Sequence, residues 1–136
     1  MNRLILDTNI LVSSLIQKNY PYLIVEHCLE GDAGLCLSSI LLKEYIEVLR
    51  RPKFARFPDF SSNASFLITR LSELAEIYEP KTKLDIIKDY PDNRLLELAQ
   101  ESKADFIITG NTKDFYMDNF DNTQILTPKQ YWEEYK

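Results

Sequence analysis

Acidic residues in this sequence stand where predicted strands give way to helices or turns, and carboxylates gathered at such places can bind metal ions. The first is Asp7, which follows the apolar run 4–6 and precedes Thr8 and Asn9. A short apolar run that ends at polar residues is typical of a strand buried on both faces of a parallel sheet. In open α/β sheets, ligands bind at the carboxyl ends of the strands. Asp7 is therefore placed where a carboxylate can take part in chemistry.

Further polar residues fall at comparable places along the chain. They follow a predicted strand or lie near the start of a predicted helix: Glu44, Asp92, Asn111 and Asp114. In a parallel sheet all of them reach the same edge, where clustered carboxylates repel one another unless a cation intervenes. Oxygen ligands of this kind suit Mg²⁺ or Mn²⁺. Two such ions can activate water and stabilise the leaving oxygen of a phosphodiester.

Each of these residues, taken alone, also has a purely structural interpretation. The polar trio that starts at Asp7 can serve as a helix cap. Glu44 alone fits a solvated helix face better than a site. Asp92 stands where a helix cap or a first-turn acid is common. The combination indicates a site only if the topology brings the side chains together.

The elements that must position these residues alternate between strands and helices. Strands are predicted at 4–6, 35–37, 76–78, 105–110 and 124–126, and helices at 10–16, 22–29, 40–51, 64–75, 93–102 and from 127 onward. This alternation predicts an α/β fold, a three-layer α/β/α sandwich with a mainly parallel central sheet of about five strands. We expect one domain over residues 1–136, with connections at 52–63 and 79–92.

Capping and breaking residues mark several of the predicted helix ends. Thr8 or Asn9 is expected to cap the first helix, and Gly31 to stop the second. Thr127 is expected to cap the last helix, with Gln130 completing a capping box. Asp92 is expected immediately before the helix over 93–102, and Glu44 one turn into the helix over 40–51.

Composition and charge limit the class of protein. The chain holds only three glycines, so no Gly-rich phosphate loop is available. The net charge of −5 argues against wide, unspecific nucleic-acid binding but allows a basic patch beside an acidic cleft. The apolar segment at the start of the sequence lacks a signal-peptide pattern and is too short to span a membrane. We interpret Cys28 and Cys36 as reduced core residues. Together these features predict a cytoplasmic protein. His27 is expected to pack or to lie at the surface and not to act in catalysis. Since no serine or cysteine has a convincing base, nucleophilic catalysis is disfavoured.

Four blocks of sequence carry a family resemblance. They are LILDTNILVSSLI at 4–16, LSSILLKEYIEVLRRPKF at 37–54, DYPDNRLLELAQESKADFIITGN at 89–111 and ILTPKQYW at 125–132. In this order they resemble a PIN domain, and in particular the short toxins of prokaryotic toxin–antitoxin pairs, the VapC-like ribonucleases. The resemblance implies a parallel-sheet α/β/α fold, Mg²⁺- or Mn²⁺-dependent cleavage of RNA, and inhibition by a cognate antitoxin. Dimers are common in that family, so a homodimer is also implied.

The resemblance assigns roles residue by residue. The catalytic, metal-binding acids correspond to Asp7, Glu44 and Asp92. Supporting positions correspond to Thr8, Asn9, Asp89, Thr109, Asn111 and Asp114. The fourth acid of many family members is replaced here by Asn111, which offers an oxygen but no charge. Either Asp114 substitutes for it, or the site holds one metal rather than two.

A basic run follows the predicted helix that carries Glu44. Its cations are Arg50, Arg51, Lys53 and Arg56. They are interleaved with aromatic residues, so the run is a candidate for holding RNA phosphates, with Phe54 or Phe57 stacking on an unpaired base. A solvated helix end explains the same cations equally well.

The preferred prediction is a metal-dependent endoribonuclease, a phosphodiester hydrolase that acts as the toxin of a toxin–antitoxin pair. The alternative is a catalytically weak or inactive PIN-like module that binds RNA or protein, which the neutral Asn111 motivates. A phosphotransfer domain is disfavoured, because Asn9 stands where a phosphatase of this pattern carries its second acid. The expected partners are an RNA substrate and a cognate antitoxin, with no membrane.

Overall fold

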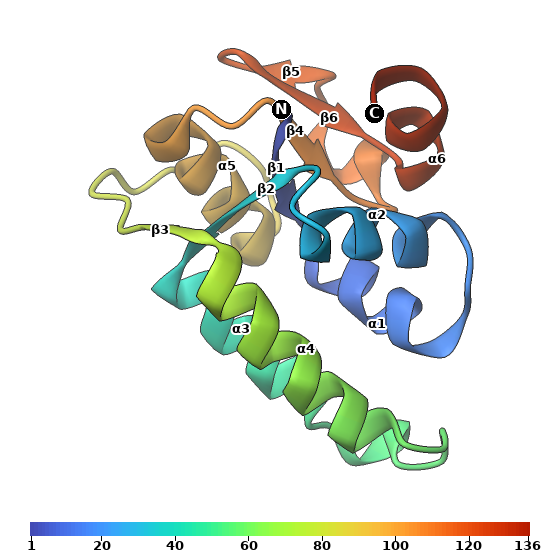
Figure 1. Ribbon diagram of the computed structural model, residues 1–136. Coiled ribbons are helices and arrows are strands. Elements are labelled where there is room, and N and C mark those ends of the chain that lie inside the picture. Colours follow the sequence, from blue (N-terminus) through green and yellow to red (C-terminus); the bar gives the residue numbers. More distant parts are fainter.

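A six-stranded sheet runs through the middle of the computed structural model, which describes residues 1–136 (Figure 1). The strands are β1 (Arg3–Leu6), β2 (Gly34–Ser38), β3 (Glu76–Tyr78), β4 (Phe106–Ile108), β5 (Asn119–Phe120) and β6 (Thr123–Leu126). Their order is β3-β2-β1-β4-β6-β5, and every pairing is parallel except that of β5 with β6. The predicted sheet of about five strands therefore gains the short edge strand β5.

Helices cover both faces of this sheet (Figure 1). They are α1 (Thr8–Ile16), α2 (Tyr20–Leu29), α3 (Ser39–Leu49), α4 (Phe60–Leu74), α5 (Tyr90–Ser102) and the short α6 (Pro128–Gln130), with helical turns at η1 (Pro52–Phe54), η2 (Thr112–Phe115) and η3 (Tyr131–Tyr135). Helices α1 to α4 lie on one side of the sheet and α5 lies on the other. The predicted α/β/α sandwich is confirmed.

The central strands are apolar throughout because both of their faces are covered. Leu4, Ile5 and Leu6 of β1 are fully buried, as are Ile107 and Ile108 of β4. They belong to one cluster of 33 buried apolar residues. An uninterrupted apolar run is therefore the right signal for β1 and β4, and the structure confirms both strands.

Capping residues mark the start or the end of several helices. The Ser38 hydroxyl accepts a hydrogen bond from the backbone N–H of Leu41 at the start of α3. Thr127 and Gln130 form the predicted capping box at α6. Gly31 adopts a φ of +82° just after α2, where a side chain would be strained.

The predicted start of α5 is wrong. The helix begins at Tyr90, so Asp92 lies in its first turn and does not precede it. Pro91 explains the difference, because proline needs no N–H partner in the first turn of a helix and fits there without a break. Likewise α4 starts at Phe60, four residues earlier than expected.

The two cysteines, Cys28 and Cys36, are free and buried, as predicted. His27 packs edge-on against Trp132, with 5.5 Å between the ring centroids, which agrees with its expected packing role. None of the helices is long and apolar enough to span a membrane.

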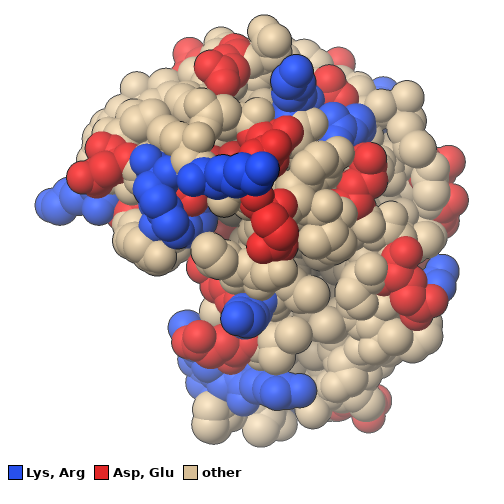
Figure 2. Space-filling model, turned by 90° about the vertical axis from the view of Figure 1, so that its left-hand side faces the viewer, with Lys and Arg blue, Asp and Glu red and all other residues tan.

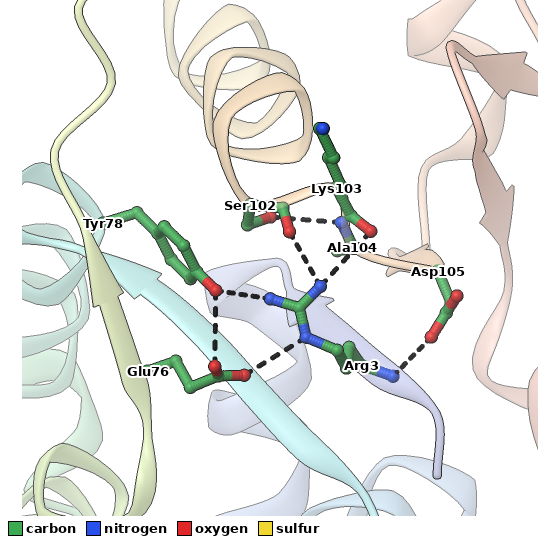
Figure 3. Close-up of polar contacts among 7 residues, drawn as sticks. All are labelled: Arg3, Glu76, Tyr78, Ser102, Lys103, Ala104 and Asp105. Atoms are coloured by element: carbon green, nitrogen blue, oxygen red, sulfur yellow. Dashed lines mark hydrogen bonds and ion pairs between the residues drawn. The ribbon is translucent and has the colours of Figure 1, made fainter.

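A polar network around Arg3 closes the amino edge of the sheet (Figure 3). The Arg3 guanidinium donates hydrogen bonds to the Ser102 carbonyl at 2.7 Å, to Glu76 Oε1 at 3.2 Å and to the Tyr78 hydroxyl at 2.5 Å. The backbone N–H of Arg3 donates to Asp105 Oδ2 at 2.8 Å. One side chain thus ties β1 to β3 and to the end of α5.

Candidate active site

A cleft of about 540 Å³ opens at the opposite edge, where the parallel strands end. The predicted acidic and supporting residues that line it are Asp7, Thr8, Asn9, Glu44, Asp89, Asp92, Asn111 and Asp114. Figure 2 shows a hollow on this side of the molecule, with acidic side chains on its walls and basic side chains at its rim. Of the predicted supporting residues, only Thr109 does not line the cleft, because it is fully buried beneath it.

Asp7 occupies the turn between β1 and α1. Its backbone N–H donates to the Ile108 carbonyl at 3.0 Å, which extends the pairing of β1 with β4 by one residue. Its carboxylate accepts a hydrogen bond from the Thr109 hydroxyl at 2.7 Å. Burial raises the pKa of Asp7 above its ordinary value, although the Thr109 hydroxyl and the backbone N–H groups of Thr8 and Asn9 oppose the rise.

The predicted cap of α1 is wrong, because the N-cap position belongs to Asp7 and no side chain caps the helix. Thr8 lies inside the helix instead. Its hydroxyl donates a hydrogen bond to the Glu44 carboxylate of α3, which lies 36 residues away in the sequence. Thr8 thus joins two elements of the cleft, a role that its type alone does not reveal.

Glu44 is half-buried on α3, and two contacts fix its position. One is the hydrogen bond from Thr8. The other comes from the neighbouring Tyr45, which is fully buried and donates from its hydroxyl to the Leu6 carbonyl at 2.5 Å. This bond sets α3 against the end of β1. Burial, and to a lesser degree the charge of Asp7, raises the pKa of Glu44.

Asp92 has the clearest electrostatic signature of the cleft. Its side chain is buried, and none of the ion pairs in the structure involves it. Its pKa is raised to about 7, chiefly by burial and then by the negative charges of Asp89, Asp7, Asp114 and Glu44, in that order. The carboxylates of the cleft are therefore close enough to destabilise one another's charged forms.

Asn93 positions the segment that leads into the cleft. Its side-chain oxygen accepts hydrogen bonds from the backbone N–H groups of Ile86 and Ile87, at 2.9 and 3.0 Å. Its amide nitrogen donates to the carbonyls of Ile87 and Asp89, at 2.7 and 3.2 Å. The sequence analysis did not predict this role. The available signal was an amide placed three residues before the buried Leu96, and so on the apolar face of the helix.

The basic run contributes less to the cleft than the sequence suggests. Of its four cations only Arg51 lines the cleft, together with Lys43, which was not predicted. Lys53 lies over the ring of Phe54 and Arg56 over the ring of Phe57, at 5.2 and 4.9 Å. Arg50 lies in a separate groove between α3 and α4.

The proposed stacking role of Phe54 is wrong. Phe54 is 9% exposed and stacks on Phe60, with 4.8 Å between the ring centroids. Its ring is part of the core and cannot receive a base.

The donor chemistry of the cleft fits a hard divalent cation. Every acidic group offers oxygen ligands. Burial, and then the mutual repulsion of the carboxylates, raises the pKa values of Asp7, Glu44 and Asp92, and a bound cation would relieve this repulsion. No three acidic, histidine or cysteine side chains stand close enough to hold one ion directly among them. A divalent cation such as Mg²⁺ is commonly bound through one or two carboxylates and retains several waters, so it does not require three direct protein ligands.

Fold and cleft together define an α/β protein with an acidic site at the carboxyl edge of a parallel sheet. Residues 3–113 match the PIN domain family, and the chain belongs to that family. The uncharacterized protein MJ1680 of Methanocaldococcus jannaschii is 28% identical over 144 residues, which cover 98% of this chain and 92% of that protein.

A solved structure is also similar. It is the crystal structure of VapBC2 from Rickettsia felis bound to a DNA fragment from their promoter, in which one chain matches with a TM-score of 0.61. The match covers 92% of this chain and 98% of that chain at 18% sequence identity. At this identity the likeness shows a shared fold.

Proposed function

We propose that this protein is a divalent-metal-dependent endoribonuclease that hydrolyses RNA phosphodiesters in the acidic cleft. The observation that carries the proposal is the convergence of Asp7, Glu44 and Asp92, from three separate elements, on one open cleft. Membership of the PIN domain family supports the reaction class, because the family resemblance implies ribonuclease activity.

The proposal gives each residue of the cleft a role. Asp7, Glu44 and Asp92 would hold Mg²⁺ or Mn²⁺, directly or through water. Thr109 orients the Asp7 carboxylate, and Thr8 orients that of Glu44. When bound, the ion supplies activation of water and stabilisation of the leaving oxygen.

The remaining polar groups support the acids and the substrate. Asn9, Asp89, Asn111 and Asp114 line the cleft and can hold metal-bound waters. Arg51, with Lys43, places positive charge at the cleft wall, where it can contact RNA phosphates. Arg50, Lys53 and Arg56 would act on parts of the RNA outside the cleft.

The biological role that fits best is the toxin of a prokaryotic toxin–antitoxin pair. The fold shared with a chain of the VapBC2 structure supports this role, and a cognate antitoxin would be the partner that blocks the cleft. A homodimer in the cytoplasm is the accompanying proposal. A short neighbouring gene that encodes a DNA-binding protein would support the pairing.

The direct test is RNA cleavage by the purified chain. Wild-type protein with Mg²⁺ or Mn²⁺ should cut single-stranded RNA, and EDTA should stop the reaction. Asp7→Asn should abolish cleavage while circular dichroism shows an unchanged fold. A mutant that cuts RNA at the wild-type rate would refute the assignment of Asp7.

A second candidate function follows from one observation, the neutral Asn111 in the cleft. With one negative charge fewer than many family members, the chain would bind RNA or an antitoxin without cutting. Calorimetry with Mn²⁺ separates the two candidates. Absence of both metal binding at millimolar concentration and cleavage would favour the binding module.

A further inference from the structure

A second, smaller cavity adjoins the acidic cleft. It measures about 360 Å³ and is lined by Lys88, Asp89, Asp114 and Tyr116. Asp89 and Asp114 also line the cleft, so the two cavities share a wall. A polymer that lies in the cleft therefore reaches this cavity without leaving the surface.

Tyr116 stands out among the residues of this cavity because its ring has no partner. The side chain is 75% exposed. It takes part in none of the aromatic, cation–π or side-chain hydrogen-bond contacts of the chain. Tyr90, the first residue of α5, is also strongly exposed, but the Arg94 guanidinium covers its ring at 4.1 Å.

The backbone presents this ring from an anchored turn. The preceding Phe115 is fully buried, and the N–H of Tyr116 donates to the Lys113 carbonyl at 3.3 Å. Tyr116 itself has a φ of 58°, in the left-handed region that residues with a side chain adopt only at an energetic cost. In this conformation the aromatic ring of Tyr116 is exposed to solvent beside the cleft.

We propose that the cavity at Tyr116 is a base-binding subsite, in which an unpaired base of the RNA stacks on the tyrosine ring. Aromatic rings bind bases of single-stranded RNA by stacking, whatever the base. Lys88 can contact a neighbouring phosphate, and the carboxylates of Asp89 and Asp114 can accept hydrogen bonds from base N–H groups. The inference rests on the proposed function, since it takes RNA to be the polymer in the cleft.

The test measures RNA affinity in the Asp7→Asn background, so that the RNA stays intact. The probes are a fluorescein-labelled single-stranded RNA of 12 nucleotides and the same sequence as a duplex, followed by anisotropy with Mg²⁺ present. Tyr116→Ala and Tyr116→Leu should each raise the Kd for the single strand by about tenfold. Tyr116→Phe and Tyr116→Trp should stay within about twofold of the parent, because they keep a stacking face.

Two controls make the result specific. The duplex has no splayed base, so Tyr116→Ala should leave its affinity unchanged. Phe66→Ala removes a comparably exposed ring, 65% exposed, from the groove between α1, α2 and α4, and should not change the affinity for the single strand. Equal losses for Tyr116→Ala and Phe66→Ala, or no loss for Tyr116→Ala, would overturn the subsite.

Cleavage assays with an intact Asp7 separate this inference from the proposed function. The subsite predicts that Tyr116→Ala raises KM with little change in kcat. If the wild type cuts RNA and Tyr116→Ala has an unchanged KM, the subsite fails and the ribonuclease proposal stands. If RNA binding depends on Tyr116 but nothing is cut, the ribonuclease proposal fails and the subsite stands. If the wild type does not bind RNA, both fail.

Discussion

The surroundings of Asp92 change the pKa of its side chain. Its pKa rises from 3.8 to about 7, chiefly through burial and then through the neighbouring carboxylates. Between these two values the folded chain holds a proton that the unfolded chain has released. In the absence of metal, the free energy of unfolding should therefore fall as the pH rises from about 4 to about 7.

Replacing Asp92 by Asn should remove this pH dependence. We expect Asp92→Asn to stabilise the metal-free protein at pH 8 by about 2 kcal/mol. The upper limit is about 4 kcal/mol, which corresponds to the full rise of the pKa from 3.8 to about 7. At pH 4.5 the effect should be small, because the native Asp92 is already protonated there. Urea denaturation in EDTA measures both values. The exposed Asp85→Asn variant is the control, and a gain for Asp92→Asn that is equal at both pH values would contradict the argument.

Asn111 is the residue at which this chain departs from many family members. Restoring a carboxylate there should strengthen cation binding, because affinity for hard cations rises with the charge of the ligands. We expect Asn111→Asp to tighten Mn²⁺ binding by about threefold to tenfold in calorimetry. The same variant should lose about 0.5–1 kcal/mol of stability in EDTA at pH 8, through repulsion among the acids. Unchanged or weaker Mn²⁺ binding, with Asn63→Asp as the surface control, would argue against a cation site at this position.

Helix α5 organises the cleft at the scale of the elements. Its first turn carries Asp92, and the next residue, Asn93, holds four backbone groups of the segment before the helix. The Glu97 carboxylate also accepts a hydrogen bond from the Leu84 N–H at 2.7 Å. The chain between β3 and α5 has no strand or helix of its own, so these side chains determine where Asp89 lies.

Asn93→Ala should therefore weaken both the fold and the cleft. Three backbone groups of Ile86 and Ile87 would lose their partner, while the Asp89 carbonyl keeps the backbone N–H of Asn93. We expect the change to lower the free energy of unfolding by about 3 kcal/mol. Amide hydrogen exchange should accelerate at residues 84–89 and stay unchanged in β1. Asn93→Asp keeps the acceptor but loses the donor, so its effect should be intermediate. A loss below about 1 kcal/mol, with exchange unchanged, would mean that other contacts hold the segment.

The sequence predicts the elements better than it predicts their contacts. The apolar runs in β1 and β4 and the capping box at Thr127 are local signals, and each is confirmed. The start of α5 is hidden, because Pro91 resembles a helix breaker. The hydrogen bonds from Thr8 to Glu44 and from Thr109 to Asp7 span 36 and 102 residues, so no local pattern encodes them.

At the scale of the whole molecule, the two edges of the sheet differ: one carries a hydrogen-bonded network, and the other carries the candidate active site. The amino edge is closed by the Arg3 network, and the carboxyl edge opens into the acidic cleft (Figures 2 and 3). The two edges also differ in whether their charged side chains form ion pairs. Arg3 is paired with Glu76, whereas no basic side chain pairs with Asp7, Glu44 or Asp92.

This separation predicts that Arg3 can be changed without affecting the cleft. Arg3→Met should lower the free energy of unfolding by about 1–3 kcal/mol, because partly buried carbonyl and hydroxyl groups lose their donor. Mn²⁺ affinity should stay unchanged. Arg70→Met, which removes an exposed helical ion pair with Glu73, is the control and should cost less than about 0.5 kcal/mol. A fall in Mn²⁺ affinity for Arg3→Met would show that the two edges are coupled.

The most direct measurement is Mn²⁺ binding followed by electron paramagnetic resonance, in which bound ions lose the signal of free Mn²⁺. The wild type should bind with a Kd below about 1 mM at pH 7.5. Asp7→Asn, Glu44→Gln and Asp92→Asn should each weaken binding by about tenfold, while Asp85→Asn should not. If the free Mn²⁺ signal persists at several times that concentration, or if the three cleft variants bind as tightly as the wild type, the cleft does not hold a divalent ion.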